Sequence, residues 1–241
     1  MEAPSRRREP VSWLSRLLAP NRASVVALVA AQALCPWLGA ARAEDRMKMP
    51  VAPRGRPAHH AFADADRSAQ LTALRLRYLR ERRREGLALL AWGSLNVLGG
   101  SIAAGIKHDD QAWLSASVTT LGFGLINALL SLPLLDLSGH RRALVEREQS
   151  QPPMSIERLH QREAAAQLKS GQVFALNAGL DLVYLATGAF LLAMSQRDTR
   201  HAEWERGVGA AFLVQAPFLL GFDIGCWIRA NRRAATLSGQ R

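Results

Sequence analysis

Residues 171–194 read GQVFALNAGLDLVYLATGAFLLAM, and Asp181 is the one charged side chain in this apolar stretch. A helix rises about 1.5 Å per residue, so about 20 residues cross the roughly 30 Å of hydrocarbon in a bilayer. The stretch therefore predicts a transmembrane helix. Asp181 would lie roughly 15 Å deep in it, where a carboxyl group is costly and requires an explanation.

Three other stretches have the same apolar character: 86–106, 112–135 and 207–228. Short polar segments separate the first from the second and the third from the fourth, so each pair is expected to form antiparallel neighbours. Pro133 falls in the last turn of the second stretch and is expected to kink or end that helix. The sequence thus predicts an all-α polytopic membrane protein, a four-helix transmembrane bundle made of two tandem hairpins, 86–135 and 171–228.

The two hairpins resemble each other. Aligning residues 93–96 with residues 178–181 places Asn96 opposite Asp181, and aligning the second helices places Asn127 opposite Gln215. Such a tandem arrangement is typical of a parallel repeat with a pseudo-two-fold axis along the membrane normal. The alternative is that any two transmembrane hairpins align weakly through their hydropathy.

The N-terminus has the three parts of a secretory signal peptide. A basic segment precedes the apolar run 23–40, and Ala41-Arg42-Ala43 is a small-residue cleavage site. Residues 1–43 are therefore expected to be a signal peptide, and the alternative is an uncleaved anchor helix. Residues 44–63, rich in Pro, Ala, Arg and His, predict a flexible linker.

Three polar segments flank the hairpins. Residues 64–85 predict a basic amphipathic helix that lies against anionic headgroups, or else a solvated helix end. Residues 136–170 predict a polar connecting segment with a short helix that has Ser155 as its N-cap. Residues 229–241 predict a basic tail.

The formal net charge of +11 permits nucleic-acid binding in principle. The arginines instead flank apolar spans, as membrane anchors do, and no nucleic-acid-binding signature is present, so no nucleic-acid partner is expected. No nucleophile stands beside a base at motif spacing, which argues against an enzyme. No metal site or cofactor is expected, and Cys226 reads as a small core residue.

Each span carries a polar side chain, and such groups usually face the interior of a bundle. Asn177, Asp181 and Tyr184 share one helix face, and Arg229 could reach back toward Asp223. The candidate binding residues are Asn96, Asn127, Asn177, Asp181, Tyr184, Gln215 and Asp223. They predict either interhelical hydrogen bonds that hold the bundle together, or a polar pocket or proton-linked pathway at the midplane.

Two functions follow from these alternatives. One is a binding or transport-related membrane protein that uses the polar cluster. The other is a structural or accessory subunit that holds a membrane-protein partner or forms a homo-oligomer, with the lipid bilayer as its surroundings in both cases. Small residues along the first two spans suit close helix packing in either role.

The segments Asn177–Asp181 (NAGLD) and Gln215–Asp223 (QAPFLLGFD) resemble a family of uncharacterised small bacterial multi-pass membrane proteins, known only as a domain of unknown function. The Gly-rich first span with Asn96 also fits, whereas the region around Asn127 departs from the family pattern. The resemblance implies a signal peptide and four transmembrane helices, and it implies no activity.

The expected location is the bacterial inner membrane. A cleaved signal peptide would leave the start of the mature chain outside the cytoplasm. The arginines before the first span and after the last favour the opposite orientation by the positive-inside rule. An uncleaved first helix would reconcile the two, with five spans.

Overall fold

The structure, a computed structural model, describes residues 58–151, 154–197 and 200–239. This part of the chain contains helices and no strand. The helices are α3 (Ala58–Ile106), α4 (Gln111–Leu135), α5 (His140–Ser150), α6 (Ile156–Met194) and α7 (Ala202–Leu237). Four of them, α3, α4, α6 and α7, are long and apolar enough to cross a membrane. The all-α class and the four-helix bundle are therefore confirmed.

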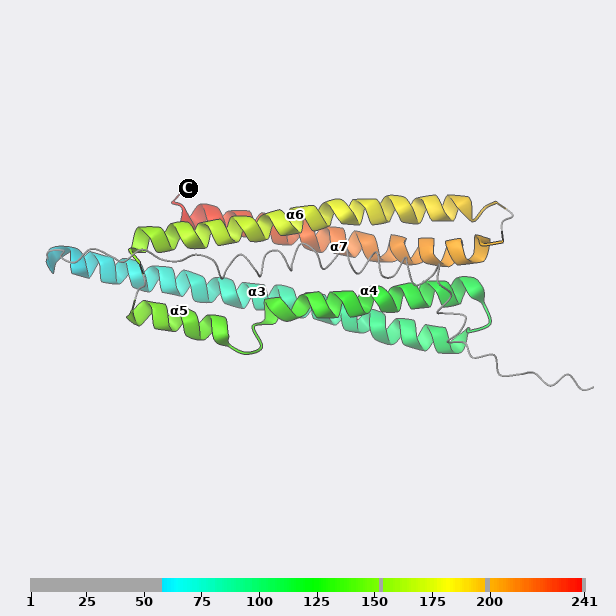
Figure 1. Ribbon diagram of the computed structural model, residues 1–241, viewed down its shortest axis with the longest axis horizontal. Helices are drawn as coiled ribbons and strands as arrows, with labels where there is room; N and C mark the ends of the chain where they lie inside the picture. Colours follow the sequence, from blue (N-terminus) through cyan, green and yellow to red (C-terminus); the bar gives the residue numbers. More distant parts are fainter. Residues whose placement is uncertain (1–57, 152–153, 198–199, 240–241) are drawn as a thin grey trace, which may run out of the picture.

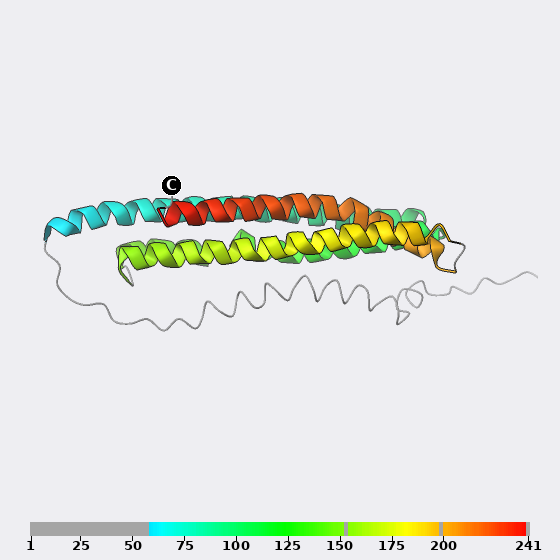
Figure 2. The same ribbon diagram turned by 90° about the horizontal axis from the view of Figure 1, so that it is seen from above.

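The long helices form two antiparallel pairs in an elongated bundle (Figures 1 and 2). α3 packs along α4, α6 packs along α7, and α4 joins the two pairs through its contact with α7. The C-terminal ends of α3 and α6 lie at one end of the bundle (Figure 1). The start of α3, α5, the start of α6 and the end of α7 lie at the other.

Local sequence signals set several helix ends. The Asp110 side chain accepts a hydrogen bond from the Trp113 backbone N–H at 2.9 Å and caps the start of α4. The Ser155 hydroxyl accepts one from the Arg158 N–H at 3.5 Å, which confirms Ser155 as the N-cap of α6. α4 ends at Leu135, in the turn that contains Pro133.

α3 is longer than either segment expected within it. Its 49 residues span about 74 Å, so residues 64–85 and the first transmembrane span are one helix. The helix begins at Ala58, which corrects residues 58–63 of the linker expected over 44–63. Pro57 is the last proline before the span, and nothing after it breaks a helix until the glycines of the span itself. The expected signal peptide and the rest of the linker lie outside the described residues.

The connecting segment 136–170 is also more helical than expected. The structure adds α5, which begins after Gly139 and ends before the Pro152-Pro153 pair. The short helix after Ser155 continues into the third span as one helix of 39 residues, because no Pro or Gly interrupts it before Gly171.

The expected basic tail is mostly helix. α7 continues to Leu237 through a run of Ala and Arg that favours helix and contains no Pro or Gly. At this end of the bundle, side chains from α3, α6 and α7 form an apolar cluster of Leu71, Tyr78, Leu159, Ala164 and Leu237. One face of residues 64–85 therefore packs against protein, a contact that neither the expected position on lipid headgroups nor the solvated alternative included.

Glycines let the helices of each hairpin approach closely. A Cβ atom added at Gly93 would lie 2.7 Å from the Gly124 carbonyl oxygen, and one added at Gly124 would lie 2.7 Å from the Gly93 oxygen. Gly188 and Gly209 form a similar contact between α6 and α7. Backbones this close leave no room for a side chain, so these positions fix the crossing of each pair.

Candidate functional site

Two of the predicted site residues join α3 to α7 in a closed hydrogen-bond network. Gln215 Nε2 donates to Asn96 Oδ1 at 2.6 Å, and Trp92 Nε1 donates to Gln215 Oε1 at 3.0 Å. Asn96 Nδ2 completes the network by donating to the Trp92 backbone carbonyl at 2.8 Å. Gln215 is fully buried and Asn96 nearly so. This arrangement is interhelical bonding between satisfied groups.

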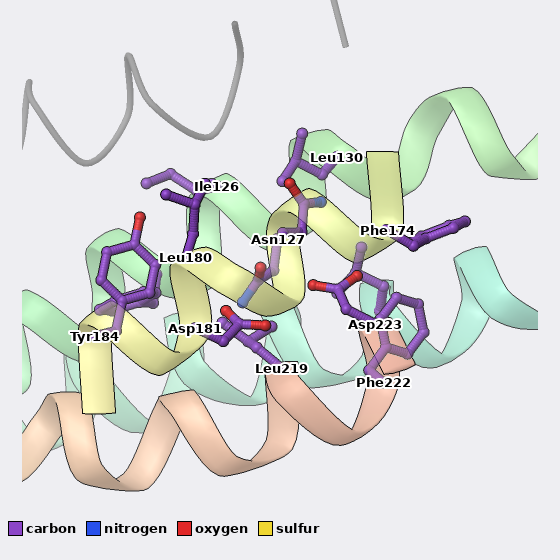
Figure 3. Close-up of a pocket in the computed structure, with 13 residues that line it drawn as sticks. Ile126, Asn127, Leu130, Phe174, Leu180, Asp181, Tyr184, Leu219, Phe222 and Asp223 are labelled. Carbon is purple, nitrogen blue, oxygen red and sulfur yellow. The ribbon is translucent and has the colours of Figure 1, made fainter. Parts of the chain in front are cut away.

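The other five predicted residues line a small cavity between α4, α6 and α7, which Leu89 of α3 also borders (Figure 3). Its volume is about 50 Å³, and one water requires roughly 10–15 Å³ measured in this way, so the cavity has room for a few waters. The walls are mainly Leu, Ile and Phe. The polar groups that reach the cavity belong to Asn127, Asn177, Asp181, Tyr184 and Asp223.

Asp181 and Asp223 bring two carboxyl groups together in this cavity. Their relative exposures are 3% and 6%, and their carboxyl groups are close enough to share a hydrogen bond. Figure 3 shows Asp181 on α6 and Asp223 on α7 with their carboxyl groups next to each other. A hydrogen bond between two carboxyl groups requires that one of them carry the proton.

The cavity also contains unpaired polar atoms. Asp181 Oδ2 and Asn127 Nδ2 are both buried, and neither has a hydrogen-bond partner among the described residues. An acceptor and a donor thus line the same space. Leaving such groups without partners costs about 1–3 kcal/mol each, so the cavity favours water or a small ligand that bonds to both.

Tyr184 forms one wall of the cavity through its ring. The ring packs edge-on against Phe123 and Phe212, with centroid distances of 5.6 Å in both cases. These contacts hold α6 against α4 and α7. Asn177, one turn before Asp181 on α6, is half-buried at the same cavity.

The two polar sites follow the internal alignment of the hairpins. Asn96 bonds to Gln215, and the aligned residues Asp181 and Asn127 line the cavity with unpaired atoms. The same alignment places Trp92 opposite Asn177, because each stands four residues before the polar residue of its span. The indole of Trp92 fills space and donates to Gln215, whereas the shorter Asn177 side chain borders the cavity.

The expected contact between Arg229 and Asp223 is wrong. Arg229 Nε bonds to Glu85 Oε1 at 2.9 Å, and its Nη2 donates to Cys226 Sγ at 3.2 Å. Glu85, on α3, takes this arginine because the end of α7 runs beside the extended first half of α3. Asp223 is therefore left to the cavity.

Buried ion pairs beyond the spans were missed at the sequence level. Arg233 is 5% exposed and bonds to Glu85 at 2.7 Å and to Glu81 at 3.0 Å. The sequence does contain a pattern that could have predicted this pairing. Glu81 and Glu85 stand four residues apart on α3, and Arg229 and Arg233 stand four residues apart on α7. Farther from the spans, the buried Arg75 bonds to carboxylates of α5 and α6, at Glu148 and Glu163.

Within the described parts of the chain, no group of three or more His, Cys, Asp or Glu side chains is arranged to hold a metal ion. The His59-His60 pair is on α3, and its side chains are outside the described ones.

Comparison with known proteins gives one family. The model described as "Family of unknown function (DUF6992)" matches residues 88–224, which include nearly all of both hairpins and every cavity residue. No curated protein matches the chain, and no solved structure matches it.

Proposed function

This chain belongs to DUF6992, a family of unknown function, and we propose that it is a transport-related membrane protein that binds a proton at the Asp181–Asp223 pair. The observation that carries the proposal is the cavity itself. It joins two adjacent carboxyl groups to two unpaired polar atoms in the part of the bundle that the bilayer would surround.

The size of the cavity supports a small occupant. Sites for organic ligands usually measure about 300–1,000 Å³, and this cavity measures about 50 Å³. A few waters fit, and an amino acid or a sugar does not. Water at this position would contact Asp181 Oδ2 and Asn127 Nδ2 and would give the carboxyl pair a route for exchanging a proton.

The chemistry of the carboxyl pair supports a proton rather than a fixed charge. Two adjacent carboxylates in a water-poor site repel each other, so one of the two retains a proton. Carboxyl groups inside membrane bundles commonly take part in proton relays. The proton exchanged with cavity water would then set the charge of the pair.

The alternative function, an accessory subunit held together by interhelical bonds, is favoured by a different part of the bundle. The Trp92–Gln215–Asn96 network is closed, and each side-chain nitrogen and oxygen in it has a partner. We therefore assign Asn96 and Gln215 to bundle stability and the five cavity residues to binding. The proposed location is the bacterial inner membrane, reached through the N-terminal signal segment.

The test uses the full-length protein reconstituted in liposomes. Infrared difference spectra across a pH titration should contain a carboxyl band that Asp181→Asn and Asp223→Asn each abolish. Proton uptake after a pH jump, followed with an enclosed pH-sensitive dye, should decrease in the same two variants.

The matched control is Asp109→Asn, the same acid-to-amide change on the exposed turn between α3 and α4. It should leave both signals unchanged. A carboxyl band that persists in both cavity variants, with unchanged proton uptake, would contradict the proposal and favour the accessory role.

A further inference from the structure

A second, larger cavity lies at the end of the bundle where the first span begins and the second span ends. It measures about 590 Å³ and is formed by α3, the end of α4, the turn after it and the start of α5. This volume falls in the range of about 300–1,000 Å³ found for ligand sites. Its position at the end of the apolar segments puts it at the level of the lipid headgroups.

Three arginines line this interfacial pocket: Arg80 and Arg83 of α3 and Arg142 of α5. Arg80 and Arg83 form no ion pair with a described carboxylate, in contrast to Arg75 and Arg233 of the same bundle. Arg142 forms only an exposed pair with Glu146 one turn along α5. The pocket therefore has a surplus of positive charge.

Asp136, the one carboxylate that lines the pocket, already has hydrogen-bond partners. Asp136 accepts hydrogen bonds from the backbone N–H groups of Arg141 and Arg142, at 3.3 and 3.4 Å, and so caps the start of α5. It satisfies the helix terminus rather than the arginine side chains. A phosphate would supply the anion that the three guanidinium groups lack, and arginine binds phosphate well.

The apolar part of the pocket continues toward the membrane. Leu76, Leu79, Leu135 and Leu137 line it beside the arginines. On α4, from the pocket toward the middle of the second span, runs a row of exposed leucines at helical spacing. Leu132 is 43% exposed, Leu129 is 56% exposed and Leu125 is 49% exposed. A molecule with a phosphate at the pocket and acyl chains along these leucines would match both surfaces.

We propose that this interfacial pocket binds the headgroup of an anionic phospholipid, with the phosphate held by Arg80, Arg83 and Arg142. Basic pockets between membrane helices bind anionic headgroups in this way. The site is separate from the Asp181–Asp223 cavity and does not depend on the function proposed for that cavity.

The test is native mass spectrometry of the full-length protein in detergent micelles. The probes are phosphatidylglycerol and phosphatidylcholine with the same acyl chains, and inorganic phosphate. Phosphatidylglycerol should remain bound in preference to phosphatidylcholine. Replacing Arg80, Arg83 and Arg142 together by Gln should lower the apparent affinity for phosphatidylglycerol by at least about tenfold.

The matched control replaces Arg84, Arg147 and Arg158 by Gln, which removes the same charge from exposed positions outside the pocket. It should change the affinity less than about twofold. Phosphatidylglycerol should also raise the melting temperature of the wild type and the control variant but not that of the pocket variant.

Three results would overturn the proposal. Equal loss of binding in both triple variants would mean that total charge, not the pocket, attracts the lipid. Equal retention of phosphatidylcholine would mean that no anionic site exists. Displacement of the lipid by inorganic phosphate would identify a site for a soluble anion.

Discussion

At the scale of single residues, the two buried polar sites differ in whether their hydrogen bonds are closed. Gln215 has two partners, and both belong to α3. Asp181 and Asn127 each keep an unpaired atom. A buried group with partners stabilises the fold, whereas an unpaired one costs free energy and persists only where something else favours it. This difference separates a structural role from a binding role among residues of the same chemical type.

The residue-scale prediction concerns Gln215→Leu. The change leaves Trp92 Nε1 and Asn96 Oδ1 without their partner and should lower the free energy of unfolding by about 1–3 kcal/mol. Unfolding in mixed micelles with increasing SDS, followed by circular dichroism, measures the loss. The control is Asn127→Leu, which removes a donor that has no partner and should cost less. An equal cost for the two variants would contradict the assignment.

At the scale of elements, glycines act by their position on each helix rather than by their number. Gly93 and Gly124 face each other across the α3–α4 contact, whereas Gly99, Gly105 and Gly122 have no neighbour within 4 Å of an added Cβ. The small residues of the first two spans therefore fall into two groups. Gly93 and Gly124 set how closely the two helices of the hairpin cross. Gly99, Gly105 and Gly122 have no neighbouring helix and leave the surface there without a side chain.

The element-scale prediction compares Gly93→Ala with Gly99→Ala. Both variants gain up to about 1 kcal/mol of helix propensity. Only Gly93→Ala places a methyl group against the backbone of α4, and such overpacking costs about 1–3 kcal/mol. Gly93→Ala should therefore be less stable than Gly99→Ala in the same SDS titration. Equal stability would show that α3 and α4 do not approach as closely as the structure indicates.

At the scale of the whole molecule, the helices extend well beyond the apolar spans at one end of the bundle. The spans supply about half of α3 and α6, and the remaining turns, with α5 and the end of α7, form a helical extension (Figure 2). Its interior combines the Leu71–Tyr78 cluster with the Glu85–Arg233 ion pair. The extension thus ties the first helix of the described chain to the last.

The whole-molecule prediction concerns Arg233→Met. Breaking a buried ion pair costs about 3–5 kcal/mol, and we expect about 3 kcal/mol because Arg229 still bonds to Glu85. Thermal unfolding in detergent measures the loss. The neighbouring Arg232 is exposed, and Arg232→Met should change the stability by less than about 0.5 kcal/mol. If the two variants matched, the segment after residue 228 would be a loose tail, as its composition suggests.

Much of the candidate site could be predicted from the sequence. The polar residues in the spans were identified because a polar group in an apolar run stands out and must face inward. The partners of these residues could not be predicted, since Asn96 and Asp181 are each a polar residue in the middle of an apolar span. The arginines read as membrane anchors, because composition alone does not distinguish an exposed arginine such as Arg80 from the buried, ion-paired Arg233.

The sequence by itself determined the four spans and the two hairpins, because the need for about 20 consecutive apolar residues is a local property of the chain. The length of the helices and the identity of each partner were decided only by the tertiary structure. Whether Gln215 meets Asn96, or Glu85 meets Arg233, depends on the height and rotation of helices far apart in sequence. Those follow from packing at contacts such as Gly93–Gly124, which no single segment contains.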